Sequence, residues 1–260
     1  MTIAYEVVGD GPAVVLICGL GGAGRFWEPT ARLLAPRFRV ISFDHPGIGG
    51  SARCPGPASI GGIADAALEA AHKAGVDRFA VVGHSTGGLV AQALALDEPQ
   101  RVRALVLSCT WAAADARFRR LFELRKRVLL NDGLQASEDL GDLLAYPQDF
   151  YDTHGNGGRK RGEDGEGASE AFRRTTAERI DMLLSYSRLD ELPGLRMATH
   201  IIGAVDDWIV PVNHARQLAS VIPAAGLTEM SGGHFLPRTQ AQAYARAVAT
   251  FLERAEHAEN

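Results

Sequence analysis

Residues 82–88, which read Val-Gly-His-Ser-Thr-Gly-Gly, decide the fold of this chain. They follow an apolar run that begins at Phe79 and precede an apolar, Ala-rich run at 89–96. This order predicts a strand, a sharp turn and a helix, the context in which Gly-x-Ser-x-Gly forms a nucleophile elbow. A serine on such a turn has strained backbone, so small neighbours are needed, and glycine flanks the motif on both sides. The pattern therefore predicts that Ser85 is a nucleophile, which requires a base nearby.

Strand and helix patterns alternate along most of the chain. Apolar runs predict strands at residues 3–8, 13–18, 38–43, 79–82, 102–109, 199–203 and 226–230. Helical periodicity lies between several of them, at residues 26–34, at 60–74 and finally at about 240–253. Near-continuous apolar strands separated by helices are typical of an α/β fold with a mainly parallel sheet that helices flank.

The alternation stops between about residues 111 and 195, where only helical patterns occur, including those at 117–130 and 171–186. We therefore expect a core built from residues 1–110 and 196–260, with a helical cap, or lid, at 111–195 inserted after the sixth strand. The stretch at 154–167 is nearly all glycine and charge, which predicts a flexible surface loop within that cap.

Composition narrows the function classes. The 260 residues carry a net charge of −4, which favours neither nucleic acid nor an anionic membrane as a partner. We expect no transmembrane helix, because no window holds 18 uncharged apolar residues, and no secretory signal, because residues 1–6 lack a basic region and an apolar run. Three cysteines are too few and odd in number for a disulfide framework, so we expect a cytoplasmic location. No metal-ligand spacing occurs, so we expect no metal and no cofactor. A small-molecule substrate is the expected partner, and the oligomeric state is left open.

Two segments near the C-terminal end can complete the chemistry of the serine. Asp206 and Asp207 follow the strand predicted at 199–203, and His234 follows the last predicted strand. Because parallel strands bring their carboxyl ends to one edge of a sheet, we expect these groups to meet Ser85 there. The histidine would act as the general base, and one aspartate would orient it and stabilise its charged form.

The remaining site expectations concern the oxyanion and the pocket. Backbone N–H groups of Leu20, in the glycine-rich loop after residues 13–18, and of Thr86 are the expected oxyanion donors. The expected walls of a mostly apolar substrate pocket are His84, Trp111, Phe122, Tyr146, Trp208 and Phe235.

The chain resembles the α/β-hydrolase superfamily along essentially its whole length, in the segments 18–22, 44–51, 83–88, 206–211 and 233–234. Members often carry the acid four residues before the proline of the 206–211 motif, which favours Asp207, whereas counting from Gly203 selects Asp206. The family usually has His-Gly where this chain has Cys18 and Gly19, so a polar support of that loop is missing. Within the superfamily, cap segments near Trp111, 117–133 and 144–150 resemble the pyrimidine-utilisation protein D group of aminoacrylate or carbamate hydrolases, and also enol-lactone hydrolases.

The resemblance implies a serine hydrolase that cleaves a small carboxylic ester, lactone, amide or carbamate through an acyl-enzyme. Two alternatives share the fold. One is a ligand-binding or signalling protein with little or no turnover, because fold and triad do not prove catalysis. The other is a cofactor-free perhydrolase or haloperoxidase.

Overall fold

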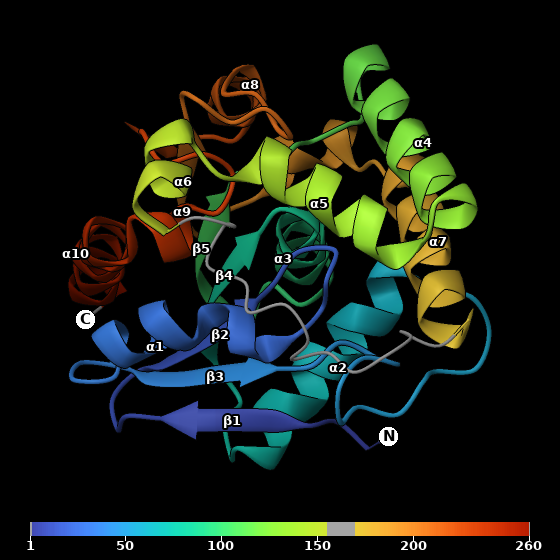
Figure 1. Ribbon diagram of the computed structural model, residues 1–260. Coiled ribbons are helices and arrows are strands. Elements are labelled where there is room, and N and C mark those ends of the chain that lie inside the picture. The colour runs from blue at the N-terminus through green and yellow to red at the C-terminus, as the bar shows by residue number, and fades with distance from the viewer. Residues whose placement is uncertain (1, 155–169, 260) are drawn as a thin grey trace.

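A seven-stranded sheet forms the centre of the molecule in the computed structural model, which describes residues 2–154 and 170–259 (Figure 1). The strands are β1 (Tyr5–Val8), β2 (Ala13–Ile17), β3 (Arg39–Phe43), β4 (Phe79–His84), β5 (Val102–Ser108), β6 (Ala198–Ala204) and β7 (Gly226–Met230). Their order across the sheet is β1-β3-β2-β4-β5-β6-β7. The edge strand β1 runs antiparallel to β3, and every other pair is parallel. The predicted mainly parallel α/β sheet is confirmed.

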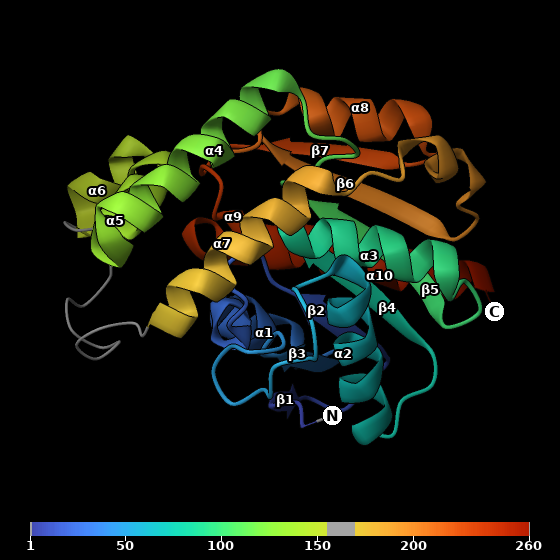
Figure 2. The same ribbon diagram turned by 90° about the vertical axis from the view of Figure 1, so that its right-hand side faces the viewer.

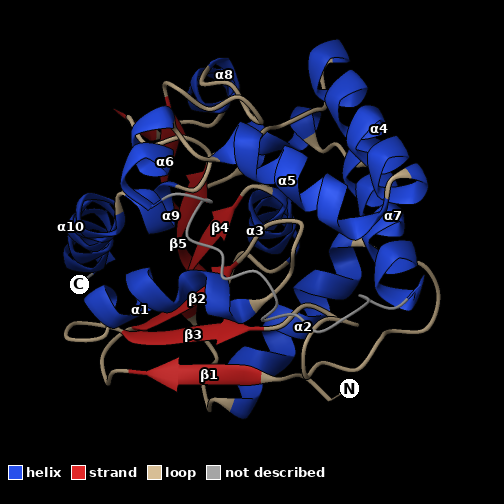
Figure 3. Cartoon of the chain, viewed as in Figure 1, coloured by secondary structure: helices blue, strands red, loops and turns tan. Residues whose placement is uncertain are grey.

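Helices cover both faces of this sheet, as the colouring of Figure 3 shows. On one face lie α1 (Glu28–Leu34) and α10 (Ala241–Glu259), and on the other α2 (Ile60–Lys73), α3 (Thr86–Asp97) and α8 (Asn213–Val221). Alternate residues of the buried strands serve the two layers. In β2, for example, Val14 and Leu16 pack into the first core and Val15 and Ile17 into the second. This explains why the central strands have no polar face in the sequence.

Four further helices stand between β5 and β6: α4 (Ala116–Asn131), α5 (Gly133–Ala145), α6 (Gln148–His154) and α7 (Glu170–Ser185). They project beyond one end of the sheet (Figure 2). The expectation that the insertion follows a sixth strand is wrong: it follows β5, the fifth strand of the chain, which ends at Ser108, and the five strand patterns before residue 111 already give that count. Of the glycine-rich stretch at 154–167, residues 155–167 lie outside the described part of the chain.

Shorter elements complete the fold: the 3-10 helices η1 (Gly24–Trp27) and η2 (Leu189–Gly194), and the one-turn α9 (Leu236–Thr239). The elements η2, α9 and α8 were absent from the sequence prediction, because short segments give little periodic signal. Within residues 2–154 and 170–259, no helix is long and apolar enough to cross a membrane.

Helix α3 can pack closely on the sheet because Gly87 has no side chain. A Cβ atom on Gly87 would lie 2.1 Å from the carbonyl oxygen of Ile17, a contact with rigid backbone. We therefore expect Gly87→Ala to lower the free energy of unfolding by about 1–3 kcal/mol or more, measured by urea denaturation. Gly61→Ala is the control, because that position in α2 faces open space and alanine is the better helix former. Equal stability of the two variants would contradict the steric argument.

Candidate active site

Ser85 occupies the turn between β4 and α3, and its backbone is strained. Its φ of 54° and ψ of −122° lie outside the regions that non-glycine residues favour. Three hydrogen bonds hold it there: its N–H donates to the Ser108 carbonyl (2.8 Å), and its own carbonyl accepts from the Thr110 hydroxyl (2.7 Å) and the Gly88 N–H (2.8 Å). Structure that fixes a strained residue in this way is typical of a functional position.

A chain of hydrogen bonds joins Ser85 to two distant side chains. The Ser85 Oγ lies 3.0 Å from Nε2 of His234, and Nδ1 of His234 lies 2.7 Å from Oδ2 of Asp207. The three residues are 3–6% exposed, so water competes little for these bonds. In this arrangement the serine hydroxyl donates to the ring, and the ring donates to the carboxylate.

The two neighbouring aspartates have different partners. Asp207 contacts His234 through Oδ2, while its Oδ1 accepts from the N–H groups of Ile209 and Val210, each at 2.8 Å. The carboxylate of Asp206 accepts from the N–H groups of Gly232 and Gly233 at 3.0 Å. Of the two acids that the sequence left open, Asp207 is the one beside the histidine ring, and Asp206 holds the loop that carries that histidine.

His84 lies directly beside the ring of His234. Its ring stacks on Phe26 (5.1 Å between ring centres) and lies 5.0 Å from the His234 ring, while its Nδ1 is 3.2 Å from the Ser108 Oγ. Burial, and secondarily the neighbouring His234, hold the pKa of His84 well below its usual value. A neutral His84 therefore adds no charge beside the candidate base.

The other expected wall residues fall into three groups. Tyr146 and Phe235 pack edge-to-face at 5.1 Å, and the Phe235 ring lies 5.7 Å from that of His234. Trp111 and Phe122 are buried, and each ring packs on that of Phe118 in α4, at 4.3 and 4.4 Å between centres. Trp208 is 66% exposed, and the structure does not bring its side chain into the buried aromatic group around His234.

The loop after β2 carries the expected oxyanion amide and rests on a cluster that the sequence did not reveal. Arg179 of α7 donates through Nη2 to Nδ1 of His45 (2.5 Å) and to the Gly19 carbonyl (3.4 Å). The other ring nitrogen of His45 lies 3.5 Å from the Cys18 thiol. His45 and Arg179 thus support the loop in which Cys18 replaces the family's usual histidine. Leu20 is part-buried in this loop, and Thr86 is the first residue of α3.

Helix α5 contacts the candidate base directly. The N–H of His234 donates to the carbonyl oxygen of Ala145, the last residue of α5, at 2.8 Å. The preceding Gly233 has a φ of 69°, and a Cβ there would lie 2.4 Å from the same carbonyl. The position of the histidine therefore depends on the end of α5 as well as on the sheet.

Buried histidines give the fold a defined pH dependence. Burial, and secondarily the charge of Arg179, hold the pKa of His45 well below its usual value, as burial does for His84. In the unfolded chain both rings gain a proton near pH 6.5, whereas in the folded protein they stay neutral. The free energy of unfolding should therefore fall as the pH drops below about 6.5, by up to about 1.4 kcal/mol per pH unit for each ring. Urea denaturation at pH 7.5 and 5.5 measures this, and His84→Gln should reduce the difference; equal stability at both pH values would contradict it.

One group in the described residues has the composition of a metal site. Ligand atoms of Cys109, Asp207 and His234 all lie within 4.8 Å of one another. However, the His234 ring already contacts the Asp207 carboxylate through Nδ1 and the Ser85 hydroxyl through Nε2, so both of its nitrogens have partners without a metal.

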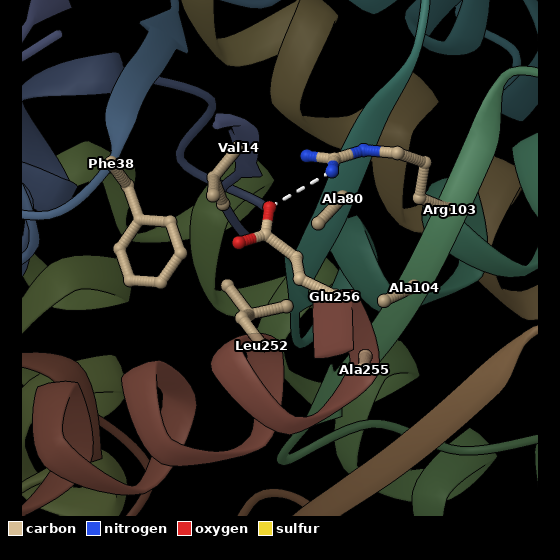
Figure 4. Close-up of a pocket in the computed structure, with 8 residues that line it drawn as sticks. All are labelled: Val14, Phe38, Ala80, Arg103, Ala104, Leu252, Ala255 and Glu256. Carbon is tan, nitrogen blue, oxygen red and sulfur yellow. Dashed lines mark hydrogen bonds and ion pairs between the residues drawn. The ribbon is translucent and has the colours of Figure 1, made fainter. Parts of the chain in front are cut away.

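A small cavity lies at the opposite end of the sheet and does not compete as a substrate site (Figure 4). It is lined by Val14 and Ala80, near the starts of β2 and β4, and by Arg103, whose Nη1 pairs with Glu256 at 2.9 Å. Its volume of about 10 Å³ is that of a single water molecule.

Several residues of the site were missed from the sequence, and one of them had a usable signal. Arg179 lies at helical spacing from Thr175, Met182 and Leu183, all of which are buried. A charged residue on the buried stripe of an amphipathic helix is rare unless it is paired, so this position could have been singled out. Ala145 acts through its backbone carbonyl, which any residue would supply. The Thr110 hydroxyl reaches the Ser85 carbonyl only in the folded chain, so neither contact leaves a sequence pattern.

Comparison with known proteins agrees with the geometry. Residues 12–237 match the family model described as alpha/beta hydrolase fold, and the chain belongs to this family. It is a hydrolase. Among its relatives, a protein of Azorhizobium caulinodans named "Putative carbamate hydrolase RutD" is 36% identical over 88% of this chain and 86% of its own length. A protein of the same name from Caulobacter sp. strain K31 is 34% identical over 95% of both chains.

Solved structures show the same fold. The enol-lactonase from Burkholderia xenovorans LB400 superposes with a TM-score of 0.85 at 22% identity, covering 96% of each chain. A hydrolase from Pseudomonas aeruginosa PA01 gives a TM-score of 0.84 at 25% identity, over 96% of this chain and 94% of that one.

Proposed function

We propose that this protein is a serine hydrolase in which Ser85, His234 and Asp207 form the catalytic triad. The observation that carries the proposal is the unbroken hydrogen-bond chain from the Ser85 hydroxyl to the Asp207 carboxylate. In the first step the serine oxygen attacks a carbonyl carbon, and His234 takes the hydroxyl proton. The histidine then gives that proton to the leaving group. In the second half, His234 takes a proton from a water molecule that attacks the acyl carbonyl, and returns it to the Ser85 oxygen as the acid product leaves.

The negative oxygen that forms during attack needs donors on the far side from the base. We propose the N–H groups of Leu20 and Thr86 for this role. Two observations support them: Thr86 is the first residue of α3, where helix N–H groups are unpaired, and a Cβ on Gly19 would lie 3.1 Å from the Cβ of Ser85. The loop before Leu20 thus passes close to the nucleophile.

The proposed substrates are small carboxylic esters, lactones, amides or carbamates, and the relatives named as carbamate hydrolases favour a carbamate or amide among these. We also propose that helices α4 to α7 form a cap (residues 111–195) on a core of residues 1–110 and 196–260. A cytoplasmic location is proposed on the basis of three free cysteines.

Covalent labelling tests this function directly. A fluorophosphonate probe should add one label per molecule of the protein but none to Ser85→Ala, as seen by intact mass, and p-nitrophenyl acetate should be turned over. Labelling of Ser85 without turnover of any small ester, amide or carbamate would instead favour the ligand-binding alternative. No labelling would remove Ser85 as the nucleophile.

A further inference from the structure

Arg179 is buried without a negative partner among the residues that the structure describes. Its side chain is 1% exposed, and its two recorded hydrogen bonds go to neutral acceptors, the ring of His45 and the carbonyl of Gly19. Its Nε and Nη1 atoms have no hydrogen-bond partner in residues 2–154 and 170–259. Buried arginines are normally paired, because an unpaired buried charge is expensive.

The acidic side chains of the neighbouring segments are already engaged. Asp44, which follows β3, accepts from the N–H groups of Gly24 and Gly50. Glu178, next to Arg179 on α7, pairs with Arg53. Burial lowers the pKa of Arg179 to about 10, so the guanidinium stays charged at neutral pH. Among the residues that the structure describes, a buried positive charge therefore keeps two donors without an acceptor.

The location of this charge ties it to the site. Gly19 receives a hydrogen bond from Arg179, and the same glycine packs against Ser85. At the other end of the loop, a Cβ on Gly22 would lie 2.3 Å from Nη1 of Arg179. The guanidinium thus lies along the loop that carries Leu20. A purely structural anchor between α7 and this loop would be satisfied by its partners, whereas within residues 2–154 and 170–259 the Nε and Nη1 donors of Arg179 have none.

We propose that Arg179 is a specificity-determining residue that binds a carboxylate of the substrate beside the scissile carbonyl, so that this protein prefers small anionic substrates. The inference rests on the proposed serine hydrolase function. A carboxylate would supply both the missing counter-charge and the missing acceptors, and charge-assisted bonds of this kind are the stronger ones. Neutral esters of the same size would leave the guanidinium unpaired.

A matched pair of esters tests the proposal: mono-4-nitrophenyl succinate, which has a free carboxylate, and its methyl ester, which does not. For the wild type, kcat/KM should be at least about 10-fold higher for the anionic ester. In Arg179→Met this preference should fall about 10- to 100-fold, mainly through KM. Arg174→Met is the control, because that exposed arginine on the same helix should leave the preference intact. Absence of the preference in the wild type, or its persistence in Arg179→Met, would overturn the proposal.

Binding measurements separate this proposal from the proposed function. If Ser85→Ala hydrolyses both esters as fast as the wild type, the function fails, and the role of Arg179 is then tested by calorimetry with succinate and succinamide. The wild type should bind succinate at least about 10-fold more tightly than succinamide, and Arg179→Met should lose the difference. If Arg179→Met does not fold, the wild-type comparison alone decides, since equal affinity for the two compounds would contradict a buried anion site.

Discussion

Replacing Ser85 with alanine is expected to reduce kcat for p-nitrophenyl acetate by about 10³- to 10⁶-fold. The side chain is the proposed nucleophile, and the members of a triad act as a unit, so removing one forfeits most of their joint effect. The residual rate would come from the proposed oxyanion amides alone. Initial rates of the two purified proteins at equal concentration measure the loss.

A serine far from the site provides the control. Ser220, exposed on α8 with its hydroxyl bonded to the Gln217 carbonyl, should be replaceable by alanine with no change in rate. The Ser85→Ala protein should also unfold at a temperature close to that of the wild type, which separates lost chemistry from lost structure. Retention of more than about a tenth of the wild-type rate would rule out the covalent mechanism.

Replacing Asp207 with asparagine should cost nearly as much, about 10⁴-fold in kcat. The asparagine has the same shape but no charge, so it cannot stabilise a positively charged His234 and favours the wrong position of the ring proton. The rate of p-nitrophenyl acetate hydrolysis again measures the effect.

Asp206→Asn is the matched comparison, one residue away with the same change of atoms. Its carbonyl oxygen can still accept from the amides of Gly232 and Gly233, so we expect a loss of less than about 10-fold. Equal losses in the two variants would show that the acid beside His234 in the structure is not the one that drives catalysis.

The fold was predictable because its signals are local. Buried parallel strands are continuous apolar runs, and β5 and β7 lie within one residue of their predicted bounds. The glycines that flank Ser85 indicate the turn, because a side chain at either position would clash with backbone atoms. The short helix α8 was missed because nine residues give too little periodicity to separate a helix from a loop.

The site was predictable only in part, for a physical reason. Ser85 and His234 follow strand ends, so topology alone brings them near one another. The choice between Asp206 and Asp207 depends on side-chain directions in one tight turn, which spacing does not encode. Arg179 and Ala145 reach the site from helices α7 and α5. The packing of these helices is set by contacts between distant segments, so their contacts with the site cannot be predicted from local sequence.

The hydrogen bond from the His234 N–H to the Ala145 carbonyl has a consequence for how this family can diversify. If α4 to α7 form the proposed cap, they supply part of the scaffold of the proposed base, His234, and are not an interchangeable module. Chimeras that graft a foreign cap onto this core should work only if the donor segment restores an acceptor at position 145. Natural variation in substrate range is then expected to accumulate in cap residues away from the end of α5, while that junction stays geometrically fixed.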